Sequence, residues 1–317
     1  MPLAETDMML VIAGFVLLML GGEFVVQGAV TIANRLRVPP LLVGFTVVAI
    51  GTSLPELAVA LEAVGNDTPD IAVGGVLGSN VANVMLVLGT AAVLGAASDP
   101  GPGVRRDAIA VAVATAILLA AVLIGKITGQ FGVLMLLGLA SYYVYSYRTS
   151  KAEGADVEDS KSWLPENVLL AIPTTAVGGY MIWTGAEMLV EGATGLAIDY
   201  GISESVIGLS VVALGTSLPE LAVTLVAGLR GQGGVAIGNI LGSNVINILG
   251  ILGLASAYAG GIIIAPEFAG RDIWVVVLTS GFIVAMLLDE RHIGRRVGTT
   301  MIAGYLAYMA FLFLLPQ

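Results

Sequence analysis

Long apolar stretches fill most of the chain and are separated by short segments that contain charged residues, glycine or proline. A membrane-spanning helix needs about 20 consecutive, mostly apolar residues. Ten stretches meet that requirement: about residues 8–29, 39–64, 71–96, 106–125, 129–148, 164–197, 203–229, 233–259, 272–290 and 297–315. The pattern therefore predicts an all-α membrane protein with ten transmembrane helices.

The composition agrees with a membrane protein and narrows the chemistry. Of 317 residues, 57% are hydrophobic and only 11% are charged, whereas a soluble domain carries roughly 25% charged residues. So few charges cannot cover a water-exposed surface, and lipid is the expected solvent. The chain has no cysteine and a single histidine, His292. Because zinc and copper sites use those two residue types, an ion handled here is expected to have oxygen ligands.

The basic residues suggest an orientation for the spans. Eleven of the 13 Lys and Arg residues fall in the loops after spans 1, 3, 5, 7 and 9, and only Lys126 and Arg271 fall on the other side. Cytoplasmic loops carry an excess of Lys and Arg, so both termini are predicted to lie outside the plasma membrane and residues 149–163 to form a cytoplasmic linker. The first seven residues contain no basic side chain, which disfavours a cleavable signal peptide.

An internal repeat relates the two halves of the chain at an offset of 164 residues. Residues 44–61 and 208–225 are identical at 14 of 18 positions, and no gap is needed. With five spans in each half, the second half would start on the opposite face of the membrane. We therefore predict two inverted five-helix repeats, residues 1–148 and 164–317, with the substrate site near the midplane where they meet.

Each half carries a Gly-Thr-Ser-Leu-Pro-Glu segment inside a predicted span, at residues 51–56 and 215–220. Proline in a helix interior removes a backbone hydrogen bond and clashes with the preceding turn. Both spans are therefore expected to kink and to free carbonyl oxygens around Ala49 and Ala213. Free carbonyls are tolerated in a membrane only inside the protein or at a wet cavity, so a polar site is expected at both positions.

The two glutamates of these segments, Glu56 and Glu220, occupy equivalent mid-span positions. A charge at the centre of a span costs roughly 2.5–3.5 kcal/mol on insertion scales. Inverted repeats would bring the two carboxylates together, where they repel unless a proton or a cation neutralises them. A divalent ion removes both charges, and Ca²⁺ takes 6–8 oxygen ligands. The pair therefore predicts a divalent-cation site.

The spans that follow supply neutral oxygens. Ser79 and Asn83 are four residues apart, as are Ser243 and Asn247, so each pair shares one helical face. Hydrogen bonding between helices is an alternative role, since polar side chains often connect membrane helices. We favour ion ligation for Asn83 and Asn247 because glutamates lie in the neighbouring spans, and helix packing for the asparagine directly after each serine.

Glu23 and Glu187 also occupy equivalent positions, near the ends of the first and sixth predicted spans. They could attract ions at the two entrances of a pathway. Equally, they could be structural carboxylates that reach water at the membrane interface. The sequence leaves both roles open.

At these motifs the sequence resembles the Ca²⁺/cation antiporter superfamily, specifically its prokaryotic Na⁺/Ca²⁺ exchanger branch. The G-T-S-L-P-E and G-S-N-x-x-N segments are similar to that family's two α-repeats, and the resemblance covers all ten predicted spans. It implies that spans 1 and 6 slide against the other eight. It also implies ion ligands at Thr52, Ser53, Glu56, Ser79, Asn83, Thr216, Ser217, Glu220, Ser243 and Asn247, with the carbonyl oxygens of Ala49 and Ala213.

One position departs from the family pattern. Many members carry Asp where this chain has Asn247, and asparagine keeps an oxygen ligand but cannot ionise. The resemblance therefore implies exchange without a K⁺ requirement. The short linker similarly argues against a built-in Ca²⁺-sensing domain.

The resulting prediction is a secondary antiporter, not an enzyme, that exchanges Na⁺ for Ca²⁺ by alternating access and needs no cofactor. The nearest alternative is an exchanger that uses H⁺ or carries another divalent cation; a cation channel or a non-transporting scaffold is less favoured. A channel lines one pore with several subunits, whereas one chain would complete this site. A monomer is compatible with that arrangement, and the sequence leaves the oligomeric state open. Its expected partners are Na⁺, Ca²⁺ and lipid, with no nucleic acid. The chain lacks a G-x-x-x-x-G-K-[ST] motif, which disfavours an ATP-driven pump.

Overall fold

The structure is a computed structural model that describes residues 2–95, 97, 101–152, 162–200, 215–289 and 293–314, and these residues are mostly helical. The first half contains α1 (Pro2–Leu36), α2 (Pro40–Val43), α3 (Ala49–Thr52), α4 (Leu54–Gly65), α5 (Pro69–Ala82), α6 (Gly89–Val93), α7 (Val104–Ile124) and α8 (Gly129–Ala152). The second half contains α9 (Val168–Asp199), α12 (Leu218–Leu229), α13 (Gly233–Val245), α14 (Gly253–Ala259), α15 (Pro266–Gly270), α16 (Asp272–Leu288) and α17 (Arg295–Leu314).

Several of these helices have the length and composition of membrane spans. Among the described residues, five stretches qualify: Glu5–Leu36, Pro69–Val93, Val104–Ile124, Val168–Asp199 and Gly233–Ala259. The number is six if α2–α3 and α4 form one bent span. A multi-pass membrane protein is thus supported, whereas the count of ten spans stays a prediction. Residues 203–214 of the seventh predicted span, which include Ala213, lie outside the described residues.

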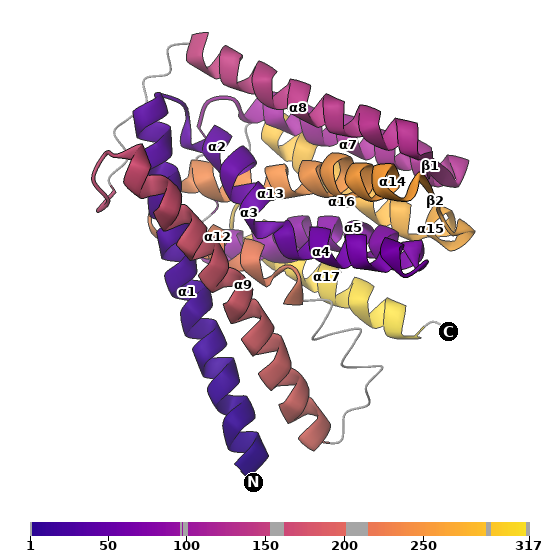
Figure 1. Cartoon of the computed structure of the whole chain (residues 1–317), viewed down its shortest axis with the longest axis horizontal. Helices are drawn as coiled ribbons and strands as arrows, with labels where there is room; N and C mark the ends of the chain where they lie inside the picture. The colour runs from indigo at the N-terminus through magenta and orange to yellow at the C-terminus, as the bar shows by residue number, and fades with distance from the viewer. Residues whose placement is uncertain are drawn as a thin grey trace.

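Two long helices stand apart in direction from the rest. In Figure 1, α1 and α9 lie side by side and run steeply, whereas most other helices cross the view from side to side. Glycines allow this close approach: a Cβ at Gly21 would lie 2.7 Å from the carbonyl oxygen of Gly178, and one at Gly185 would lie 2.8 Å from that of Gly14. Small residues bring membrane helices together in this way, so α1 and α9 form one closely packed pair.

The predicted kinks are present at the proline motifs. The helix axis bends by 46° between α3 and α4, and Ser53, with φ −87° and ψ 8°, separates them. In the second half Ser217 precedes α12 with nearly the same conformation, φ −91° and ψ 0°. Pro55 and Pro219 each lie in the first turn of the following helix, where the missing N–H costs little. The same local sequence therefore produces the same break twice.

Among the described residues, three π-helical segments lie next to these breaks. They are η1 (Gly44–Val48), η2 (Asn83–Leu88) and η4 (Ile246–Leu252). A π turn holds an extra residue and is frequent at functional sites. Asn83 begins η2 and Asn247 is the second residue of η4, so both predicted amide ligands lie where the helix widens.

Two short strands depart from the all-α prediction. Strand β1 (Lys126–Thr128) pairs antiparallel with β2 (Gly261–Ile263), residues 127 and 262 being partners. Each strand has three residues and lies beyond the end of a helix, where Gly125 and Gly260 have φ near +81° and +74°. Positive φ stops a helix, and the freed chain ends then pair with each other. The helical core is unaffected, and the strands link the two halves at one end of the molecule (Figure 1).

Candidate cation-binding site

The predicted ligands converge in the interior from both halves of the chain. Helices α3, α4 and α5 with η2 supply one set, and α12 and α13 with η4 supply the other. Their polar side chains are buried: Glu220, Asn83 and Asn247 are 0% exposed and Glu56 is 6% exposed. Carboxylates this deep are costly unless they are paired or neutralised, so the arrangement points to a charge-binding role.

Each glutamate accepts a hydrogen bond from the equivalent serine of its own half. Ser79 Oγ donates to Glu56 Oε1 over 3.4 Å, and Ser243 Oγ donates to Glu220 Oε1 over 3.4 Å. Glu220 Oε1 also lies 3.2 Å from Ser53 Oγ, which comes from the other half. The first-half serine next to the helix break therefore reaches the second-half carboxylate.

Further hydrogen bonds join the two halves. Asn247 Nδ2 donates to Ser79 Oγ over 3.1 Å. Asn83 Nδ2 donates to Asn244 Oδ1 over 3.2 Å. Asn244 thus connects helices, as predicted, whereas the equivalent Asn80 donates to the Val76 carbonyl of its own helix. The site is a single network rather than two separate half-sites.

Four buried oxygens in this network have no hydrogen-bond partner among the described residues. They are Oε2 of Glu56, Oε2 of Glu220, Oδ1 of Asn83 and Oδ1 of Asn247. Buried polar atoms normally find a partner, and these four can only accept or coordinate. Two come from carboxylates and two from amides, with each half contributing one of each kind. This donor set fits a hard cation such as Ca²⁺, which prefers oxygen ligands.

The remaining predicted ligands differ in their surroundings. Ser53 and Ser217 are both buried, and the Ser217 hydroxyl has no hydrogen-bond partner among the described residues. Thr216 is half-buried in the same segment. The Ala49 carbonyl is not freed by the proline, because it accepts the Ser53 N–H over 3.0 Å. Proline removes the bond to the carbonyl four residues earlier, which is that of Gly51. The Ala49 carbonyl also accepts from the Thr52 hydroxyl over 3.3 Å.

Thr52 has a neighbour that sequence reasoning missed. Its hydroxyl lies 3.1 Å from Oδ1 of Asn239, 3.4 Å from Ser243 Oγ and 3.3 Å from the Ala49 carbonyl. Asn239 is fully buried and donates to Thr224 Oγ1 over 3.2 Å. At the repeat offset the first half has small apolar residues in place of this pair, Gly75 for Asn239 and Ala60 for Thr224. This difference between the two halves was the signal in the sequence that could have pointed to Asn239.

Contacts to three neighbouring side chains fix the Glu23 carboxylate. Its carboxylate forms an ion pair with Arg230 at 2.8 Å and accepts hydrogen bonds from Trp163 Nε1 at 3.1 Å and from Gln27 at 3.0 Å. These contacts tie α1 to the residue that follows α12. Glu187 is exposed on α9.

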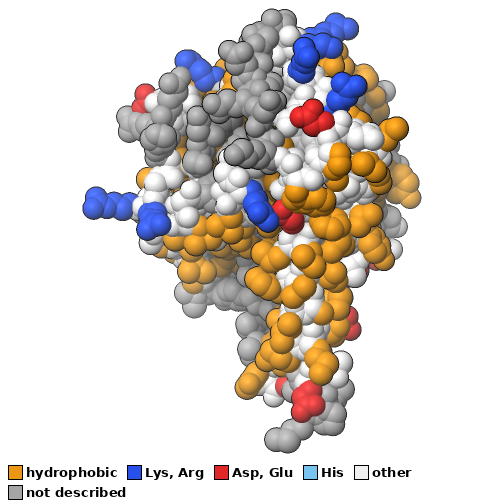
Figure 2. Space-filling view, turned by 90° about the vertical axis from the view of Figure 1, so that its left-hand side faces the viewer, with side chains coloured by type: hydrophobic (Ala, Val, Ile, Leu, Met, Phe, Trp, Pro, Cys, Tyr) orange, Lys and Arg blue, Asp and Glu red, His pale blue; other side chains and the backbone are white. Residues whose placement is uncertain are grey.

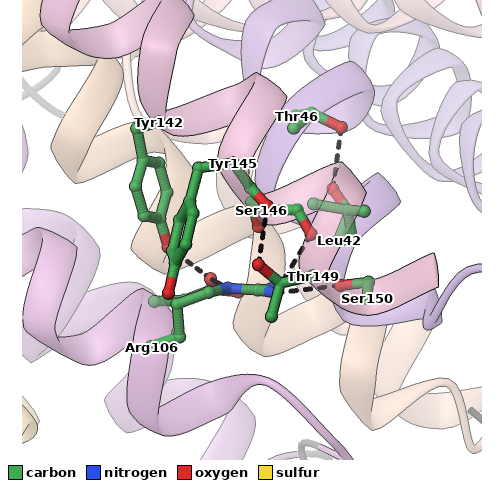
Figure 3. A network of polar contacts seen from close by, with 9 residues as sticks. Leu42, Thr46, Arg106, Tyr142, Tyr145, Ser146, Thr149 and Ser150 are labelled. Atoms are coloured by element: carbon green, nitrogen blue, oxygen red, sulfur yellow. Dashed lines mark hydrogen bonds and ion pairs between the residues drawn. The ribbon is translucent and has the colours of Figure 1, made fainter. Parts of the chain in front are cut away.

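A second buried polar network lies between α7 and α8 (Figure 3). Arg106 pairs with Asp107 at 2.9 Å and donates to the Ser146 carbonyl and to the Ser150 hydroxyl. The Tyr142 hydroxyl donates to the same Asp107 carboxylate. The second half repeats the arrangement: Arg271 pairs with Asp272 at 2.9 Å, and the Tyr308 hydroxyl donates to Asp272 over 3.1 Å.

Comparison with known proteins places these features in a family context. The family model described as sodium/calcium exchanger protein matches residues 7–148 and 170–314. The chain is 34% identical over 314 residues to the inner membrane protein YrbG of Escherichia coli, covering 96% of each. It is 28% identical over 346 residues to the sodium/calcium exchanger MaX1 of Methanosarcina acetivorans, covering 97% of this chain and 98% of MaX1. The solved sodium/calcium exchanger from Methanococcus jannaschii superposes with a TM-score of 0.81 at 28% identity, covering 97% and 98%.

Proposed function

The chain belongs to the sodium/calcium exchanger family of multi-pass membrane antiporters, and from this premise we propose that it exchanges Na⁺ for Ca²⁺ by alternating access. One observation carries the proposal: the four buried carboxylate and amide oxygens of Glu56, Glu220, Asn83 and Asn247 that lack a hydrogen-bond partner among the described residues. Together with the Thr52, Ser53, Ser79, Ser243, Thr216 and Ser217 hydroxyls and the Ala49 carbonyl, they form the proposed ion site, to which Ala213 would contribute a carbonyl.

The charge of this site suits a divalent ion. Two glutamates carry two negative charges, and Ca²⁺ cancels both. Na⁺ prefers similar oxygen ligands and can occupy parts of the same set, so the two ions compete for it. Competition for one site is what couples their movements in an antiporter. Asn247 adds no charge, and we therefore propose exchange without K⁺.

Duplicated details support ten spans arranged as two inverted repeats. The serine-to-glutamate bonds, the breaks at Ser53 and Ser217, and the Arg-Asp-Tyr networks each occur once in either half. Residues 149–163 would be the linker, although α8 continues to Ala152 and shortens it. Lys and Arg side chains are spread over the upper part of the face in Figure 2, whereas the protruding end of α1 bears apolar and acidic ones. A face that carries several basic side chains is consistent with the cytoplasmic side of the protein.

The proposed moving unit is the α1–α9 pair. Its glycine-mediated contact makes the two helices a single packed body, and their direction differs from that of most other helices (Figure 1). Gly22 of α1 also faces Ala222 and Val226 of α12, the helix that carries Glu220. Sliding of this pair past α12 would open the site alternately to either side, as the family resemblance implies.

Uptake of radioactive Ca²⁺ into proteoliposomes tests the proposal. The purified protein is reconstituted and an outward Na⁺ gradient is imposed, then replaced by an H⁺ gradient of equal size. Na⁺-driven uptake that is absent from empty liposomes supports the proposal. Uptake driven by H⁺ and indifferent to Na⁺ would assign H⁺ as the counter-ion, and downhill Ca²⁺ flux without either gradient would indicate a channel.

A further inference from the structure

A separate groove opens between the η2 segment, α16 and α17. It has a volume of about 470 Å³ and is lined mainly by apolar side chains, among them Met85, Leu278, Phe282 and Met301. Ligand-binding clefts typically have volumes of about 300–1,000 Å³. Leu278 is 72% exposed and Phe282 is 42% exposed, so the groove faces the surroundings of the protein. In the proposed arrangement of ten spans these surroundings are lipid.

The packing of α17 accounts for the groove. Gly298 lets α17 approach α6 closely, since a Cβ there would lie 2.5 Å from the Gly89 carbonyl oxygen. Met85 fills the space beside Gly304, where a Cβ would lie 2.6 Å from its Cε. Held against α6 and η2, α17 leaves a gap beside the lipid-facing side of α16. Methionine side chains at such a surface adapt to ligands of irregular shape.

One charged group marks the end of this otherwise apolar groove. Arg296 lines it and lies in the first turn of α17. The two threonine hydroxyls of the lining already donate to backbone, Thr279 to Val275 over 2.8 Å and Thr300 to Arg296 over 3.0 Å. Leu278 lies ten residues before the end of α16, about 15 Å deeper by helical rise. The groove therefore suits a molecule with a long apolar part and one anionic end.

The first half does not repeat the charge. In α8, Gly132 packs against Gly253 of α14, and in α17, Gly298 packs against Gly89 of α6. These equivalent contacts align α8 with α17. At that alignment Gln130 takes the place of Arg296. A basic residue at only one of two related positions fits a membrane whose anionic lipids are concentrated in one leaflet.

We propose that this groove binds one anionic phospholipid, with an acyl chain along Met85, Leu278 and Phe282 and the phosphate on Arg296. The apolar lining supplies the chain contact and the guanidinium supplies selectivity for a negative headgroup, since a phosphate accepts two parallel N–H bonds from arginine. The bound chain would lie against Val84 and Met85 of η2, directly after the proposed ligand Asn83.

Native mass spectrometry of the purified protein tests this binding without any transport measurement. The protein is equilibrated with equal amounts of phosphatidylglycerol and phosphatidylcholine that carry identical acyl chains. The wild-type chain should retain one phosphatidylglycerol in preference. Arg296→Gln should reduce that preference about five-fold, the equivalent of ~1 kcal/mol per basic residue near the lipid, while the matched control Arg295→Gln leaves it unchanged.

A second variant tests the apolar lining of the groove independently of the charge of Arg296. Leu278→Trp fills the groove at a lipid-facing position and should remove the retained lipid of either headgroup. Equal retention of both lipids by the wild-type protein would overturn the proposal. So would retention that survives both Arg296→Gln and Leu278→Trp. A dimer mass without bound lipid would instead assign the groove to a second copy of the chain.

Discussion

Replacement of either buried glutamate by glutamine should abolish Ca²⁺ transport and leave the fold intact. Glutamine keeps the shape of the side chain and an oxygen that can accept the serine hydrogen bond at Glu56 or Glu220. It removes one of two charges from a fully buried site. Loss of one partner from a buried charge pair costs about 3–5 kcal/mol. Since 1.4 kcal/mol is a factor of ten, Ca²⁺ affinity should fall by about two to nearly four orders of magnitude.

Two measurements make this prediction decisive. Na⁺-driven Ca²⁺ uptake should be lost in Glu56→Gln and in Glu220→Gln, but not in the control Glu62→Gln, which changes an exposed carboxylate on the same helix as Glu56. Saturating Ca²⁺ should raise the melting temperature of the wild-type protein, because a ligand that binds only the folded state stabilises it. That rise should vanish in the two site variants. Near wild-type flux from either one would remove its glutamate from the site, and a lower melting temperature without Ca²⁺ would show that the loss is structural.

Three further outcomes are expected. Asn247→Asp adds a third carboxylate for which protons can compete, so Na⁺-driven flux at clamped potential should fall more steeply toward acidic pH than in the unmodified protein. Flux through the unmodified protein that is already steeply pH-dependent and indifferent to Na⁺ would favour H⁺ coupling. Cysteines placed at Ser160 and Gln317, both outside the described residues, should be labelled from opposite sides of the membrane, and labelling from one side would refute ten spans. Tyr142→Phe removes a hydrogen bond to a buried carboxylate and should lower the free energy of unfolding by about 1.5–3 kcal/mol. Tyr308→Phe at the related position should have an effect of the same size. Thermal unfolding measures both.

The helix breaks and the buried glutamates were predictable because their causes are local. A proline inside an apolar span removes a backbone hydrogen bond whatever surrounds it, and the conformations at Ser53 and Ser217 agree with the predicted breaks. Repetition and position along the span supplied the rest. Glu23 and Glu187 are also related by the repeat, but only Glu56 and Glu220 lie in the middle of a predicted span beside a proline.

Contacts between distant helices were not predictable in the same way. Tyr142 and Asp107 are 35 residues apart, while Tyr308 and Asp272 are 36 apart. A comparison of the halves without gaps therefore misses the second network. Asn239 was overlooked for a related reason: its partner Thr52 lies 187 residues away and only tertiary packing brings them together. The error at Ala49 is of another kind. The kink was predicted correctly, but the carbonyl that loses its hydrogen bond was taken to be that of Ala49 and is that of Gly51.

The two equivalent carboxylates, Glu56 and Glu220, accept different numbers of side-chain hydrogen bonds among the described residues. Glu220 accepts hydrogen bonds from Ser53 and Ser243, whereas the side chain of Glu56 accepts one from Ser79 among the described residues. The hydroxyl of Ser217, which corresponds to Ser53, has no partner among those residues. Each hydrogen bond to a charged group contributes about 1.5–3 kcal/mol, so turning Glu220 away from an ion costs more than turning Glu56. We infer that Glu220 is the fixed ligand of the pair and Glu56 the one that adjusts. Since a preorganised ligand contributes more to affinity, Ca²⁺ titration should show a larger loss for the glutamine substitution at Glu220 than at Glu56, and equal losses would contradict this asymmetry.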